Sequence, residues 1–134
     1  MCLINNKKIK NGGDIIAYKI FKVDGEDLIT PYMGLPMKLG ESYFTGRKGC
    51  GYTREGIGHG FYHTYKNLDE ARLWVKNKAP LDLDKFKIVK VLIPNQTRED
   101  IVYEGDFYTI YSNPKCIGYA SNRIKLLEYV PVSK

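Results

Sequence analysis

The chain has few residues of the kinds that build disulfide frameworks or metal sites: three cysteines and two histidines among 134 residues. Cys2, Cys50 and Cys116 form neither an even set nor a CxxC pair, which favours free thiols in a reducing compartment. No apolar run approaches the roughly 18 residues that span a bilayer. The opening residues MCLINNKKIK lack the apolar core of a signal peptide. We therefore expect a cytoplasmic protein without membrane contact.

Motifs that identify common enzymes and nucleic-acid-binding folds are also missing. Neither GxxxxGKS/T nor GxGxxG occurs, and we find no HExxH and no Ser/His/Asp arrangement. An RNP-like string, a helix-turn-helix and a KH loop are absent as well. The motifs therefore predict no cofactor and no metal, and they leave the oligomeric state open.

Positive charge and tyrosine are what the chain does have. It carries 21 Lys and Arg against 15 Asp and Glu, a formal charge of +6, together with 11 tyrosines and five phenylalanines. An excess of positive charge favours anionic partners, although solvated lysine-rich faces produce the same balance. Aromatic residues fit the half-buried surface of a sheet.

The pattern of apolar residues predicts an α+β fold with a mostly antiparallel sheet of about six to eight strands. One helix packs on this sheet, beginning at an Asn67 cap with Glu70 in capping-box position and ending near Lys78. Residues 1–13 are expected to form a flexible arm, and residues 14–134 a single domain. The strands are expected at 15–23, 27–32, 60–64, 86–93, 101–104, 107–111, 116–120 and 123–130, with 41–45 as a short candidate strand and a hairpin turn at Gly105-Asp106.

Residues 46–60, GRKGCGYTREGIGHG, hold six glycines and are expected to form a long loop. Backbone N–H groups exposed by glycine can form a nest for an anion, and Arg47, Lys48 and Arg54 supply charge. The loop is therefore a candidate ligand-binding segment, with a surface loop of no special role as the alternative.

His59 and His63 are a second candidate, because they share one face if residues 59–63 are extended. A metal site would need further ligands that the spacing does not supply, so a structural or pocket-lining role is the alternative. For general acid–base chemistry the candidate residues are Tyr62, His63, Thr64 and Glu104. A solvated carboxylate is the alternative for Glu104.

Tyrosines that alternate with lysines, such as Tyr18-Lys19, suit the stacking of bases and contacts to phosphates. The same pattern arises from the packing of a tyrosine-rich sheet. Tyr18 and Lys19 are therefore candidate ligand contacts, and nucleic-acid binding is one hypothesis for the protein.

Several segments together carry a resemblance to known proteins: AYKIFKVDGEDLITPYMG, KLGESY, HGFYHTYKNLDEA, IVKVLIPNQ, VYEGDF and YASNRIKLLEYV. They resemble a group of small uncharacterised proteins of gut Bacteroidetes and of the phages that infect them. This resemblance implies a phage or prophage context, in which small basic proteins serve host takeover or anti-defence.

Residues 58–130 also resemble the second half of the ADP-ribosyltransferase-like fold. That resemblance implies a middle-strand motif at Tyr62, His63 or Thr64, an acidic residue at Glu104, and NAD as cofactor. Such enzymes hold NAD with an Arg or His on the first strand, where this chain has Tyr18-Lys19. The departure favours a relic of the fold with a new binding role over a working transferase.

We therefore expect a non-enzymatic cytoplasmic binding protein that engages an anionic ligand or a host protein. The alternatives are an ADP-ribosyltransferase-like enzyme and a nucleic-acid-binding protein.

Overall fold

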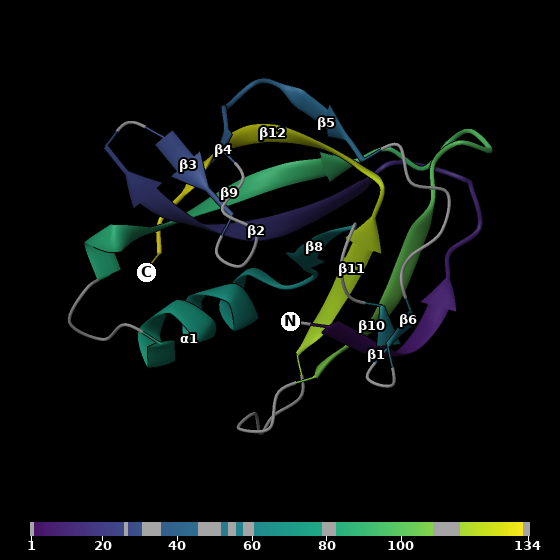
Figure 1. The fold of residues 1–134 in the computed structure, drawn as a ribbon, viewed down its shortest axis with the longest axis horizontal. Coiled ribbons are helices and arrows are strands. Elements are labelled where there is room, and N and C mark those ends of the chain that lie inside the picture. The colour runs from purple at the N-terminus through teal and green to yellow at the C-terminus, as the bar shows by residue number, and fades with distance from the viewer. Residues whose placement is uncertain are drawn as a thin grey trace.

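The computed structural model describes residues 2–25, 27–30, 36–45, 52–53, 56–57, 61–78, 83–108 and 116–132 (Figure 1). In chain order its elements are β1 (Cys2–Lys8), β2 (Ile15–Asp24), β3 (Asp27–Ile29), β4 (Pro36–Met37), β5 (Ser42–Phe44), β6 (Tyr52–Thr53), β7 (Gly56–Ile57), β8 (Tyr62–Tyr65), α1 (Leu68–Lys78), the 3-10 helix η1 (Leu83–Lys85), β9 (Phe86–Ile93), β10 (Val102–Tyr108), β11 (Ile117–Ser121) and β12 (Arg123–Val130).

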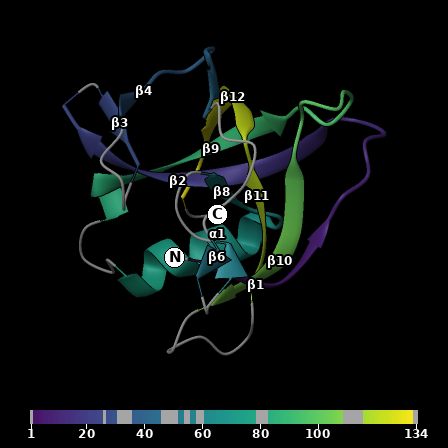
Figure 2. The same cartoon turned by 45° about the vertical axis from the view of Figure 1, so that its right-hand side comes forward.

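The strands form one sheet in the order β5-β12-β9-β2-β8-β11-β10-β1-β7-β6, with β3 paired to both β2 and β4. Every described pairing is antiparallel. β2 and β9 pair over eight residues, whereas β2 and β8 pair only at Tyr18 and Tyr65. This single pair joins two halves of the sheet, which lie at a steep angle to each other (Figures 1 and 2).

The architecture confirms the prediction of a mostly antiparallel sheet with one helix. The number of strands exceeds the predicted six to eight, because the sheet has 12 in the described residues. β4, β6 and β7 have two residues each, too few to produce a periodic pattern in the sequence.

Two segments differ from their predicted structure. Residues 2–8, expected to belong to a flexible arm, form β1, in which Leu3 pairs with Phe107. The predicted hairpin at Gly105-Asp106 is wrong, because β10 runs straight through both residues. Gly105 pairs there with Gly118 of β11, a partner that local sequence patterns do not reveal.

The sheet has two differently packed faces, and successive residues of a strand point to opposite ones. The helix face packs against α1. The other face, called the inner face below, carries the second core cluster, formed by Ala17, Phe21, Leu28, Met37, Val89, Val91, Ile93, Val102, Tyr119, Ile124 and Leu126.

Helix α1 covers the helix face with the stripe that the sequence predicts. Ala71 and Val75 are fully buried, and Trp74 meets Phe86 edge-on with ring centroids 5.7 Å apart. The capping-box interpretation of Glu70 is not what the contacts support. Its carboxylate accepts a hydrogen bond from the backbone N–H of Ile117 at 3.2 Å and so ties the helix to β11.

The chain passes from one half of the sheet to the other at Asn122, between β11 and β12. Asn122 is buried, donates to Glu99 O at 2.7 Å and accepts from Ile101 N at 3.0 Å. Its own carbonyl accepts from Thr45 N at 3.0 Å. These bonds fix the β9–β10 connection and the end of β5 to the same corner.

A second buried polar residue, Asn95, holds the chain between β1 and β2. Its side chain donates to Lys10 O at 3.0 Å, and its backbone carbonyl accepts from the N–H groups of Gly12 and Gly13. In the β9–β10 connection, Asp100 accepts from the backbone N–H groups of Gln96 and Thr97. Its carboxylate also lies 3.5 Å from Arg123 Nε. Buried backbone groups of the loops are thereby satisfied.

Gly118 lies where two aromatic rings cross β11. The rings of Tyr65 and Phe107, on the two neighbouring strands, have centroids 4.5 Å apart. A Cβ at residue 118 would contact the Phe107 ring and lie 2.6 Å from the backbone carbonyl oxygen of Thr64. The backbone cannot move aside without breaking the ladder, so only glycine fits.

We expect Gly118→Ala to lower the free energy of unfolding by about 2 kcal/mol, as overpacking of a core does. Urea denaturation measures the change. Gly12→Ala is the control, since its Cβ meets nothing within 4 Å, and it should shift stability by less than about 0.5 kcal/mol. Equal stability of the two variants would contradict the packing argument.

Candidate anion-binding site

The register of β8 and β11 decides which predicted site residues share a face. Thr64 pairs with Tyr119, and His63 pairs with Ala120. Tyr119 and Tyr62 pack in the inner cluster, whereas Ala120 belongs to the cluster beneath α1. Tyr62 and Thr64 therefore lie on the inner face, and His63 lies on the helix face.

Two further candidates with described side chains, Glu104 and Tyr18, divide in the same way. Glu104 pairs with Tyr119, so it shares the face of Thr64. Tyr18 packs against the cluster beneath the helix, as expected of the residue opposite Tyr65. The acid–base set is thus split: Tyr62, Thr64 and Glu104 lie on one face, and His63 lies on the other.

Glu104 takes part in a surface ion pair. Its carboxylate Oε1 lies 3.1 Å from Lys66 Nζ, and both side chains are about one-third exposed or more. The hydrogen bond that Lys66 donates to Glu104 raises the pKa of Lys66, with smaller contributions from the charges nearby. The Glu104 carboxylate therefore already has a cation as its partner, in an ordinary surface ion pair.

His63 is anchored by the chain beside it. Its Nδ1 lies 3.0 Å from the carbonyl oxygen of Phe61. A carbonyl only accepts, so Nδ1 carries the hydrogen in this contact. This contact holds the imidazole on the helix face. The backbone carbonyl of His63 instead accepts a hydrogen bond from Lys19, whose side chain lies on the inner face.

The remaining candidates, Arg47, Lys48, Arg54 and His59, lie outside the described residues. Among the side chains that the structure describes, no group of three or more His, Cys, Asp or Glu could hold a metal ion.

Lys19 lies where the edge of β2 changes partner. On this edge β2 pairs with β8 at Tyr18 and with β3 from Lys22 onward, and the described ladder has no pair between these two points. The Lys19 side chain occupies this interval and donates from Nζ to the carbonyl oxygen of His63 at 2.9 Å. A lysine thus satisfies a β8 carbonyl that β2 leaves unpaired.

The Lys19 ammonium is buried, and the described residues supply no carboxylate partner for it. The residue is 8% exposed and shares the inner face with Ala17 and Phe21, and its Nζ lies 5.8 Å from the centre of the Phe21 ring. Burial lowers the pKa of Lys19 to about 8, and no carboxylate among the described residues offsets this effect. An ammonium has three N–H donors, of which the bond to His63 uses one.

Two buried hydroxyl groups share this face. Thr64 Oγ1 and Ser121 Oγ are fully buried and have no hydrogen-bond partner in the described structure. Ser121 pairs with Tyr62, two residues along from the pair of Thr64 with Tyr119. The two residues are therefore diagonal neighbours, about 7 Å apart between their Cα atoms.

Two tyrosines flank the hydroxyls. Burial raises the pKa of Tyr62, with a further contribution from Tyr43, and burial also raises the pKa of Tyr119. Both phenols are therefore neutral near pH 7 and able to donate hydrogen bonds. Tyr62 and Tyr43 are half-buried, so the face reaches solvent beside them.

The arrangement has the properties of an anion site: a buried cation and hydroxyl donors, on a face whose Glu104 carboxylate is already paired with Lys66. The sequence pointed to Lys19 and Thr64 but missed Ser121. Alternation within residues 117–121 places Ile117, Tyr119 and Ser121 on one face. That this face also carries Lys19 follows only from the order of the strands.

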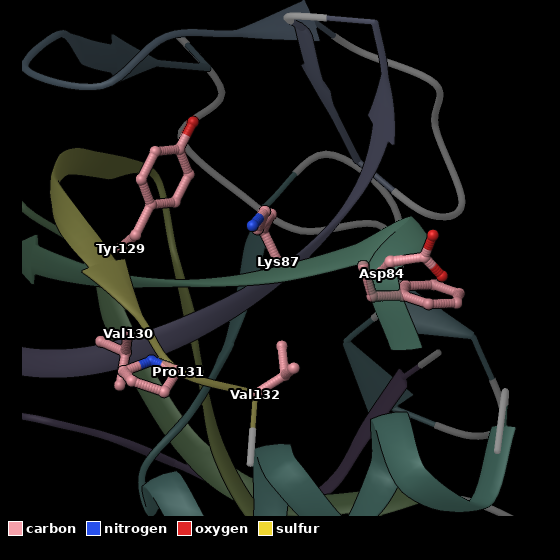
Figure 3. Close-up of a pocket in the computed structure, with 7 residues that line it drawn as sticks. Asp84, Lys87, Tyr129, Val130, Pro131 and Val132 are labelled. Carbon is pink, nitrogen blue, oxygen red and sulfur yellow. The ribbon is translucent and has the colours of Figure 1, made fainter. Parts of the chain in front are cut away.

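A separate open pocket of about 500 Å³ lies at the start of β9 and the end of β12. Figure 3 shows the Lys87 amine beside the Tyr129 ring, with Val130, Pro131 and Val132 along the other side. None of the predicted site residues that the structure describes lines it.

Comparisons of the chain with protein-family models, with curated proteins and with solved structures found no match. Among the described residues, no helix has the length and apolar character needed to cross a membrane.

The pKa of Lys19 predicts how stability depends on pH. Between pH 8 and 10.5 the unfolded chain holds a proton that the folded chain has released, so the free energy of unfolding rises with pH. The full gain is about 3 kcal/mol at about 1.4 kcal/mol per unit, and below pH 8 it is absent. Lys19→Met should remove this rise and stabilise the protein at pH 7.

Urea denaturation between pH 7 and 10.5 tests this. The other described titratable groups of the inner face include Tyr43, Tyr62, Lys66, Lys87, Glu104, Tyr119, Lys7, Asp106 and Tyr129, so the informative quantity is the difference in the free energy of unfolding between wild type and variant. Lys22→Met, at an exposed position of the same strand, is the control and should keep the wild-type profile. A Lys19→Met profile parallel to that of the wild type would show that Lys19 is not buried as a cation.

Proposed function

We propose that this protein is a non-enzymatic binding protein that holds a small anionic ligand on its inner face, at Lys19. The observation that carries the proposal is the Lys19 ammonium, which is 8% exposed and has no carboxylate partner in the described structure. A buried charge is costly unless it is paired. An anion supplies the missing countercharge.

Binding is favourable because the Lys19 ammonium is already buried at a cost in free energy, and an anionic ligand gives it an ion-pair partner. Charge-assisted hydrogen bonds are stronger than neutral ones, and a site of low polarity strengthens them further. The strands that carry the site are fixed by the Asn122 corner, so the ligand meets groups that are already in place.

The transferase alternative receives less support from the geometry. It requires a histidine or its neighbour and Glu104 to act on one substrate, but His63 and Glu104 lie on opposite faces. Glu104 is also paired with Lys66. Tyr62 and Thr64 share a face with Glu104, so a test with NAD remains informative: no change in melting temperature at millimolar NAD would remove this alternative.

The phage or prophage context, the cytoplasmic location and a host protein as partner stay predictions. Nucleic-acid binding also stays a prediction, and its signature is an affinity that falls steeply with salt.

We expect small anions to bind wild-type protein and to raise the pKa of Lys19. Acetate, benzoate, inorganic phosphate and chloride are the probes, and NMR of the Lys19 side-chain carbon next to the amine follows its protonation. Because only the ammonium attracts an anion, binding should be strongest below pH 8 and should weaken as Lys19 loses its proton.

Lys19→Met should abolish this binding, whereas Lys22→Met should leave it unchanged. If no probe affects the wild type, or if the probes act equally on Lys19→Met, the proposed function is wrong.

A further inference from the structure

The buried hydroxyl groups beside Lys19 narrow the chemical class of the ligand. We infer that the site takes a monoanionic carboxylate with an apolar body, whose two oxygens bind Lys19 Nζ, Thr64 Oγ1 and Ser121 Oγ. This inference rests on the proposed function and goes beyond it by naming the ligand class.

The first argument is the place of the three donors. Lys19 Nζ lies 2.9 Å from the carbonyl oxygen of His63, which belongs to the peptide that links His63 to Thr64. The ammonium therefore lies next to the peptide group that precedes the Cα of Thr64. Ser121 is the diagonal neighbour of Thr64 on β11. Ammonium and hydroxyls thus lie on one face of three consecutive strands, β2, β8 and β11.

The second argument is unsatisfied bonding. Thr64 Oγ1 and Ser121 Oγ are completely buried and have no partner in the described structure. Most buried hydroxyls in proteins have one, and an exception calls for an explanation. Two O–H···O contacts of about 2.7 Å each, one to either oxygen of a carboxylate, cover the span between diagonal neighbours.

The third argument is charge balance. Among the described cations near this face, Lys66 pairs with Glu104 and Lys87 lies over the Tyr129 ring, while Lys7, opposite Glu104 in the ladder, is exposed to water. The buried cation without a described carboxylate partner is Lys19. A monoanion neutralises it, whereas a dianion such as HPO4²⁻ would leave one negative charge buried and unpaired, which is strongly unfavourable.

The surroundings determine the body of the ligand. Phe21 and Ala17 lie beside Lys19 on the same strand face, and the rings of Tyr62 and Tyr119 flank the hydroxyls. Apolar and aromatic walls favour an apolar body over a polar one. An aromatic carboxylate should therefore bind more tightly than acetate.

The experiment compares benzoate with three matched probes, inorganic phosphate, benzamide and acetate, by NMR titration at pH 7 and constant ionic strength. We expect benzoate to bind at least tenfold more tightly than phosphate and more tightly than acetate. Benzamide, which has the same shape without the charge, should not bind. Tight Lys19-dependent binding of phosphate would overturn the carboxylate assignment and leave the proposed function intact.

The variants Thr64→Val and Ser121→Ala remove one hydroxyl each. Each should weaken benzoate binding about tenfold, the loss expected for one hydrogen bond to a charged group. Each should also raise the urea midpoint of the free protein, because an unpaired buried polar group is removed. Thr97→Val, at an exposed threonine, is the control and should change neither quantity.

The two readouts separate a ligand site from a structural role. If the hydroxyls only hold buried water or pack the sheet, the variants will lose stability and keep the benzoate affinity of the wild type, and the inference is wrong. No binding of any probe to the wild type would instead refute the proposed function.

Discussion

The rest of the structure depends on the way the chain turns at Asn122. β11 and β12 follow each other directly in sequence, yet they lie in different halves of the sheet. The buried Asn122 amide bonds to Glu99 O and Ile101 N and so sets the direction in which β12 leaves. In the described ladder the two halves are joined only by the pair of Tyr18 with Tyr65. The turn at Asn122 then places β11 and β12 on two sides of the same core cluster on the inner face. Side-chain amides can satisfy a donor and an acceptor at once, which suits them to such corners.

The inner face combines an apolar core with a small polar region, and the two have opposite effects on stability. Burial of Phe21, Val91 and Leu126 stabilises the fold. The Lys19 charge and the hydroxyls of Thr64 and Ser121 reduce that stability. Groups that oppose folding and lie together are characteristic of sites where function rather than stability determines the residue.

Local patterns in the sequence predicted the elements whose structure depends mostly on neighbouring residues. The helix from Leu68 to Lys78 and the strands 86–93 and 123–130 lie where periodicity placed them. β1 and the unbroken β10 escaped prediction, because each depends on a partner far away in sequence. The site was predictable to the same extent. The Tyr18-Lys19 pair made Lys19 a candidate ligand contact, but only the topology brings it beside Thr64 and Ser121.

The pairing of β1 with β10 has a consequence for how the protein folds as it is synthesised. Leu3 leaves the ribosome early, whereas its partner Phe107 follows about a hundred residues later. Pairing across such a separation closes a large loop, which is slow compared with local contacts. During that interval the single pair of Leu3 with Ile57 of β7 is the described ladder contact open to β1, and a strand with an unpaired edge is a template for association with other chains. The lysines at positions 7 and 8 of this strand oppose such association, as charged side chains do on exposed strands elsewhere.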